Sequence, residues 1–88
     1  MVRITKKEVA DLYRMDLQAQ LHVVDEKIAY FERKYHRAFT DFEQWVQSEG
    51  KDYEYWDDYI EWKAYTKTQL DLQQDIGDLQ RADIQITE

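Results

Sequence analysis

The stretch VADLYRMDLQAQLHVVDEKIAYFERKY, residues 9–35, decides the fold. Its apolar residues recur every three or four positions, a period that predicts one face of a long α-helix and not a strand. The stripe consists of Val9, Tyr13, Leu17, Leu21, Val24, Ile28, Phe31 and Tyr35. Thr5 precedes it and is followed three residues later by Glu8, which is the spacing of a capping box. We therefore predict a helix over about residues 6–36.

Two more helices are predicted downstream. Thr40 and Glu43 repeat the capping-box spacing, and Gly50 stands where a helix commonly ends, so a short helix is expected over about 41–48. A third helix is expected over about 53–81, with Gly77 either a close-contact point inside it or an early end. The rear half of this helix has one apolar stripe, made of Trp62, Tyr65, Leu72, Ile76 and Leu79.

These elements predict an all-α fold with one domain, residues 1–88. The two long helices form an antiparallel helical hairpin, and the short helix lies at its tip. Val2 and Ile4 alternate with polar residues at one end, as Ile84 and Ile86 do at the other. This period of two predicts extended termini, with residues 82–88 as an extended C-terminal tail. Two interpretations of this pattern are open: the two ends pair with each other, or the tail adds to the sheet edge of a partner.

Charge is distributed unevenly along the chain. The net charge is −7; residues 1–37 carry eight Lys/Arg and six Asp/Glu, whereas residues 38–88 carry four and thirteen. Nucleic-acid binders gain affinity from Lys and Arg that neutralise phosphates, so this balance argues against nucleic acid and anionic membranes as partners. It favours a basic protein partner, because complementary charge steers association. Acidity that only keeps a small protein soluble is the alternative interpretation.

The residue types that catalysis and metal binding need are sparse. The chain has no cysteine, its one serine is Ser48, and it contains no nucleophile motif or glycine-rich phosphate loop. Three pairs with i, i+4 spacing offer too few ligands for zinc and fit polar pairs on a helix surface. These pairs are His22–Glu26, Glu32–His36 and Asp57–Glu61. We expect no enzyme activity, no metal and no cofactor.

The chain also lacks membrane and export signals. It has no apolar run of roughly 20 residues, the length that a membrane-spanning helix needs. Its N-terminus, MVRITKKEVADL, has no apolar signal-peptide core. These features predict a soluble, cytoplasmic protein.

The segment WDDYIEWKAY, residues 56–65, concentrates rings and carboxylates at the start of the third helix. Acidic residues there complement the positive end of the helix dipole. We predict that Trp56, Tyr59 and Ile60 belong to the core, because two elements are expected to pack on this half of the helix. An aromatic patch rimmed with carboxylates is also typical of a surface that binds a basic partner.

The same region carries a family resemblance. FERKY (31–35), FTDFEQW (39–45), WDDYIEWKAY and the ADIQI-like end (82–86) resemble a family of small acidic bacterial and archaeal proteins. Members are described as uncharacterised or antitoxin-like and are encoded beside a ribonuclease-like toxin. The resemblance covers roughly residues 28–86, and WDDYIEWKAY is its most specific part. It implies direct neutralisation of a toxin, since no helix-turn-helix signal for transcriptional control is present.

Two functions follow as hypotheses. The first is an antitoxin-like protein that neutralises a basic, RNA-cleaving toxin with its acidic and aromatic helix surface and its C-terminal tail. The second is a structural helical hairpin that forms homo-oligomers. Thirteen aromatic residues are many for two long helices that each bury one stripe, so we expect a homodimer, a complex with another protein, or both. The predicted partner-binding residues are Tyr55, Asp57, Asp58, Glu61, Trp62, Tyr65, Ile84 and Ile86.

Overall fold

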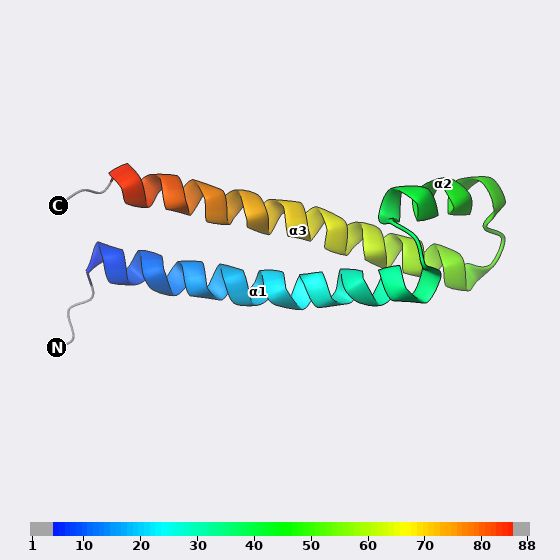
Figure 1. Ribbon diagram of the computed structural model, residues 1–88, viewed down its shortest axis with the longest axis horizontal. Helices are drawn as coiled ribbons and strands as arrows, with labels where there is room; N and C mark the ends of the chain where they lie inside the picture. Colours follow the sequence, from blue (N-terminus) through cyan, green and yellow to red (C-terminus); the bar gives the residue numbers. More distant parts are fainter. Residues whose placement is uncertain (1–4, 86–88) are drawn as a thin grey trace.

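Three helices form the part of the chain that the structure describes. The computed structural model describes the backbone of residues 5–85 and the side chains of residues 5–81. The helices are α1 (Lys6–Tyr35), α2 (Phe39–Glu49) and α3 (Tyr53–Gln85). α1 and α3 lie side by side and antiparallel, and α2 folds back against the start of α3 at the tip (Figure 1). The molecule measures 58 × 26 × 17 Å. The predicted all-α hairpin is confirmed.

α1 begins and ends close to the predicted positions. Thr5 is the N-cap, and its hydroxyl oxygen accepts a hydrogen bond from the backbone N–H of Glu8 at 3.1 Å. The helix ends at Tyr35 because His36 takes a left-handed conformation, with φ 52°. Arg33 and Lys34 lie in the last turn, where positive charge complements the helix dipole.

α2 begins two residues earlier than predicted. Its N-cap is Ala38, which makes no side-chain capping bond, and Thr40 lies inside the helix. The earlier start places the Phe39 ring 5.9 Å from Tyr59 and 5.4 Å from Trp62. A side-chain cap contributes about 1 kcal/mol, less than burying most of a phenyl ring, so packing decides the start. The predicted end is confirmed: the N–H of Gly50 donates to the carbonyl oxygen of Val46 at 2.9 Å.

α3 is longer than predicted. Its backbone is helical through Gln85, so residues 82–85 are not the start of an extended tail. Gly77 lies inside the helix and does not end it. The predicted strand-like residues Val2, Ile4 and Ile86 lie outside the described residues, as does the rest of the predicted tail, residues 86–88.

One seam joins the two long helices. Its residues are buried or half-buried and recur at alternating steps of three and four, the spacing of an antiparallel coiled coil. On α1 the seam residues are Ala10, Arg14, Leu17, Leu21, Val24, Ile28, Phe31 and Tyr35. On α3 they are Tyr55, Asp58, Trp62, Tyr65, Gln69, Leu72, Ile76 and Leu79. The polar member Gln69 donates from its amide nitrogen to Asp25 at 2.8 Å.

The first two residues of the predicted α1 stripe are not in this seam. Val9 is 54% exposed and Tyr13 is 50% exposed, whereas Ala10 and Arg14 are half-buried. The predicted stripe stepped by four three times in a row, from 9 to 21. Each step of four turns about 40° beyond a full turn, so successive steps leave the seam.

The core divides into two clusters along the hairpin. The stem cluster contains Leu17, Val24 and Leu72, from α1 and α3. The tip cluster draws on all three helices and contains Phe31, Phe42, Val46, Tyr59 and Trp62.

The Trp62 indole is the centre of the tip cluster and is fully buried. It stacks on Phe31 at 5.5 Å between ring centroids and 15° between planes, and it lies 5.2 Å from Phe42. Its Nε1–H has no hydrogen-bond partner among the described residues. Leaving that donor unpaired costs about 1–3 kcal/mol. Burying the indole contributes about 5 kcal/mol, so packing outweighs the lost hydrogen bond.

The two glycines predict opposite effects of the same substitution. A Cβ at Gly77 would meet nothing closer than a flexible Arg81 nitrogen at 3.6 Å, so Gly77→Ala should stabilise the protein by about 1 kcal/mol. A Cβ at Gly50 would lie 2.8 Å from the carbonyl oxygen of Val46, so Gly50→Ala should destabilise it. Urea denaturation of both variants tests this, and a loss of stability in Gly77→Ala would contradict the open helix face.

Candidate functional site

The acidic start of α3 contains an ion-pair network that ties it to the end of α1. Asp58 is the centre: its Oδ2 accepts from Lys34 Nζ at 2.7 Å and from the Tyr35 hydroxyl. Lys34 also reaches Glu54 Oε1 at 3.2 Å. The Asp58 side chain is only 15% exposed. Asp58, predicted as a partner-binding residue, is therefore engaged within the fold.

This network shifts two titrations toward alkaline pH. The hydrogen bond from Asp58 raises the pKa of Lys34, with Glu54 adding to the effect. Burial and the hydrogen bond to Asp58 raise the pKa of Tyr35. At neutral pH Lys34 is charged and Tyr35 is protonated, so neither is poised for proton transfer there. At neutral pH the network therefore has a structural role, which is to hold the start of α3 against the end of α1.

Three predicted site rings face inward to different degrees. Trp62 is fully buried, so its side chain cannot touch a partner while the tip cluster is intact, and its assignment to a partner surface is corrected. Tyr55 is half-buried, with its ring 4.9 Å from Trp45. Tyr65 is also half-buried, and its hydroxyl donates to Glu61 at 3.2 Å. Burial and the charge of Glu61 raise the pKa of Tyr65.

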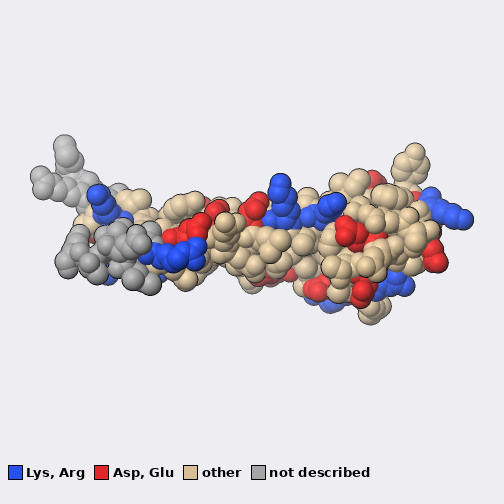
Figure 2. All heavy atoms as spheres, turned by 90° about the horizontal axis from the view of Figure 1, so that it is seen from above, with Lys and Arg blue, Asp and Glu red and all other residues tan. Residues whose placement is uncertain are grey.

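Asp57 and Glu61 are the predicted carboxylates that face solvent. They are four residues apart on α3 and therefore lie on one side of the helix. The side chain of Asp57 makes no hydrogen bond or ion pair with residues 5–81. Charge of both signs is interspersed over one face of the molecule, with uncharged surface between (Figure 2). The charges on that face therefore do not form a uniform field.

Two residues predicted as core are exposed instead. Ile60 is 62% exposed and Trp56 is 38% exposed. Tyr53, on the same side of the helix, is 89% exposed. The sequence did place Trp56 and Ile60 opposite the Trp62 stripe, but α2 was expected to cover them. α2 instead packs over Tyr59 and Trp62 through Phe39, because one helix of 11 residues covers only a narrow strip of α3.

These exposed residues form one surface, which we call the α3 patch. It consists of Tyr53, Trp56, Asp57, Ile60 and Glu61. Trp56 is held in place, because its Nε1–H donates to the Gly50 carbonyl oxygen at 3.0 Å and its ring meets Tyr59 edge-on at 5.7 Å. The α3 patch therefore presents a fixed indole beside the exposed side chains of Tyr53 and Ile60 and the carboxylates of Asp57 and Glu61.

The remaining predicted site residues lie at the far end of α3. The backbone of Ile84 is helical, and its side chain is outside the described part of the chain. Ile86 is outside it altogether. The α3 patch and position 84 are at opposite ends of a 33-residue helix, roughly 35 Å or more apart, so the structure does not bring them together.

The described part of the chain lacks the features of a metal site and of a membrane-spanning helix. No group of three or more His, Asp or Glu side chains in this part of the chain is arranged to hold a metal ion. His22 Nε2 and Glu26 Oε1, one of the i, i+4 pairs, form an exposed ion pair at 3.1 Å. None of the three helices, over the residues described, is long and apolar enough to cross a membrane.

Comparison with known proteins adds no assignment. No family model matches the chain, and neither the curated proteins nor the solved structures contain a match to it.

The ion-pair network predicts a loss of stability at alkaline pH. Lys34 and Tyr35 have raised pKa values in the fold, so their contribution is complete below their ordinary values of 10.5 and 10.0 and falls as pH rises above them. Tyr35→Phe should cost about 1.5 kcal/mol at pH 7, because a hydrogen bond to a charged group is lost. It should also flatten the decline in unfolding free energy above about pH 10.

Urea denaturation followed by circular dichroism at neutral and alkaline pH measures both effects. Tyr53→Phe, at a ring that is 89% exposed, is the matched control and should behave as the natural protein does. An unchanged alkaline slope in Tyr35→Phe would contradict this role for the network.

Proposed function

We propose that this chain is a non-catalytic protein-binding hairpin that docks on a basic protein through the α3 patch. The observation that carries the proposal is the outward position of Tyr53, Trp56 and Ile60 on one side of α3. Aromatic and large aliphatic side chains that cluster on a rigid helix are typical anchors of protein interfaces. Trp56 is already fixed by its bond to Gly50, so little side-chain entropy is lost when it binds.

Charge supports a basic partner. The α3 patch has apolar anchors beside Asp57 and Glu61, and residues 38–88 hold thirteen of the nineteen acidic residues. Carboxylates at the rim of an interface accelerate association with a positive surface and reject negative ones. Asp57, which has no ion-pair partner among residues 5–81, is available for such a contact.

The specific form of this function is neutralisation of a basic, RNA-cleaving toxin. A protein that binds RNA needs a positive groove for phosphates. In the proposal, Asp57 and Glu61 take the place of phosphates at such a groove, and Tyr53, Trp56 and Ile60 supply the apolar contact. The family resemblance of WDDYIEWKAY supports this form. In this proposal the exposed residues of the α3 patch make the partner contacts that were predicted from the sequence for Asp58 and Trp62.

The test is co-expression with the protein encoded by the neighbouring gene, followed by affinity capture and a growth assay. The natural chain should bind that protein and relieve any growth arrest that it causes. Ile60→Asp, or Asp57→Lys combined with Glu61→Lys, should weaken binding by tenfold or more, a change of about 1.4 kcal/mol, and abolish relief. Added salt should weaken the complex further.

A matched control distinguishes the α3 patch from general surface effects. Leu70 is 61% exposed and lies on the same helix as Ile60, which is 62% exposed. Leu70→Asp should bind as the natural chain does, and circular dichroism should show that all variants remain helical. Equal losses for Ile60→Asp and Leu70→Asp would rule out the α3 patch. No binding by the natural chain would remove the neutralisation of that neighbour.

A further inference from the structure

α1 has a second apolar face, which does not contact α3. Six of the large hydrophobic residues of α1 are at least half exposed; they are Val9, Leu12, Tyr13, Met15, Val23 and Tyr30. Four of them belong to a row that recurs at alternating steps of three and four. We call this row the α1 stripe, and it contains Val9, Leu12, Asp16, Ala19, Val23, Glu26 and Tyr30. The same spacing on the other side of α1 forms its seam with α3, so the stripe has the pattern of a second helix-packing surface.

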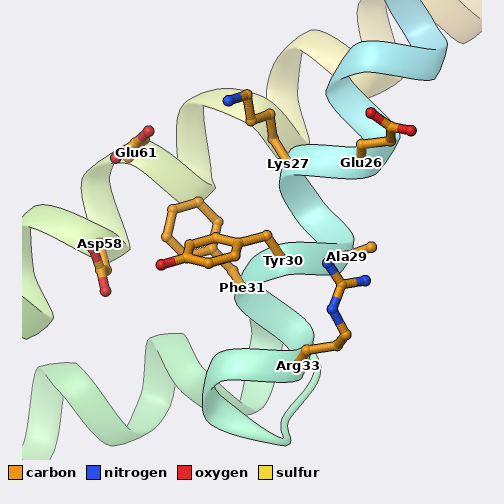
Figure 3. Close-up of a pocket in the computed structure, with 8 residues that line it drawn as sticks. All are labelled: Glu26, Lys27, Ala29, Tyr30, Phe31, Arg33, Asp58 and Glu61. Atoms are coloured by element: carbon orange, nitrogen blue, oxygen red, sulfur yellow. The ribbon is translucent and has the colours of Figure 1, made fainter.

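A hollow lies at one end of the α1 stripe. Its volume is about 680 Å³. It lies between α1, which contributes Glu26, Lys27, Ala29, Tyr30, Phe31 and Arg33, and α3, which contributes Asp58 and Glu61. Four of the α1 residues, Glu26, Ala29, Tyr30 and Arg33, have the spacing i, i+3, i+4 and i+7, which is the arrangement of four residues around a hole that receives one side chain of a facing helix. In Figure 3 the Tyr30 ring lies beside Phe31, with Asp58 and Glu61 on the α3 side, while Arg33 projects from α1 away from α3. The small side chain of Ala29 leaves the hollow open.

We propose that the α1 stripe pairs with the α1 stripe of a second copy of this chain, antiparallel and about a two-fold axis near residue 21. This register places Leu12 of each copy opposite Tyr30 of the other, at the hollow. Ala19 then faces Val23 near the axis, where small side chains let the two helices approach closely. Each copy supplies both the side chain that inserts and the hollow that receives it, as a two-fold interface requires.

The chain exposes more surface than a compact monomer of the same mass, and the excess is close to the area that a standard interface buries. The chain exposes 7030 Å². A compact monomer of 10.8 kDa would expose about 5500 Å², so the excess is roughly 1500 Å². A standard protein interface removes about 1600 Å² in total from both partners. This excess belongs to the whole elongated chain, and it is large enough to supply the area of such an interface.

Two polar residues of the α1 stripe give the register a distinctive charge signature. In the proposed pairing, Asp16 of one copy faces Glu26 of the other, an unfavourable like-charge contact. Lys27 lies next to this contact, and His22 is paired with Glu26 at 3.1 Å. Replacing one of the two carboxylates by lysine converts the contact into an ion pair, whereas replacing both restores repulsion. A parallel pairing would place Asp16 against Asp16 and would not show this pattern.

The α1 stripe and the α3 patch are on different helices and share no residue, and they meet only at the hollow, which Glu61 of the α3 patch also lines. The dimer proposal therefore stands without the proposed partner. If the chain does not form this dimer, the proposal of partner binding is unaffected. If the chain does not bind the partner, the proposal of the dimer is unaffected.

The first test is the mass in solution, measured by analytical ultracentrifugation of the full chain at roughly 100 μM. The expected result is a dimer of the 10.8 kDa chain. Leu12→Asp should raise the dissociation constant by about tenfold or more, because Leu12 is 60% exposed in the monomer and inserts into the partner's hollow in the dimer. Leu70→Asp, at a 61% exposed site outside the stripe, is the matched control and should not change it. A monomer at this concentration, or equal effects of the two variants, would overturn the proposal.

The second test addresses the register. Asp16→Lys and Glu26→Lys should each strengthen the dimer. The double variant should lose this gain, because the contact is again between like charges. The chain has no cysteine, so Leu12→Cys in one copy and Tyr30→Cys in another provide a unique disulfide pair. Residues 12 and 30 are about 27 Å apart along one helix, beyond the roughly 7 Å that a disulfide spans, so any bond between them joins two chains. A mixture of the two variants should cross-link on oxidation, and Leu12→Cys alone should not. Efficient cross-linking of Leu12→Cys alone would refute the antiparallel register.

Discussion

The burial of the Trp62 indole is the constraint on which the rest of this structure depends. A hairpin of two helices is too thin to enclose so large a ring, since each helix offers only one seam. α2 supplies the missing side, and the ring then meets Phe31 from α1 and Phe42 from α2. This requirement explains why α2 folds back, why it starts at Phe39 and why it must end abruptly at Gly50.

The charge of the tip follows from the same packing. Once Trp62 and Tyr55 turn inward, Asp58 is carried to the edge of the core beside the end of α1. A carboxylate there would be costly without partners, and Lys34 and Tyr35 provide them. The acidic start of α3 thus divides by helix position. Asp58 stabilises the fold, whereas Asp57 and Glu61 remain available to solvent.

The elongated form of the molecule gives its two remaining apolar surfaces separate places. The α3 patch lies on the first turns of α3, and the α1 stripe follows the side of α1 away from α3. In the two proposals, a molecule 58 Å long engages one partner at its tip and a second copy along its stem. A dimer built on the stem would present two copies of the α3 patch, which increases apparent affinity for a partner with two sites.

The sequence by itself determined the number, type and order of the helices, because apolar period, Thr5 and Gly50 act over a few neighbouring residues. It also showed that aromatic and acidic residues concentrate over residues 53–65. It did not decide which rings there are exposed. Trp56 and Ile60 lie at different angles around α3 from Tyr59. Whether a given angle is buried depends on where α2 packs and on how much of α3 it covers. Tertiary packing therefore chose between core and surface, and it alone placed Asp58 against Lys34, 24 residues away in the chain.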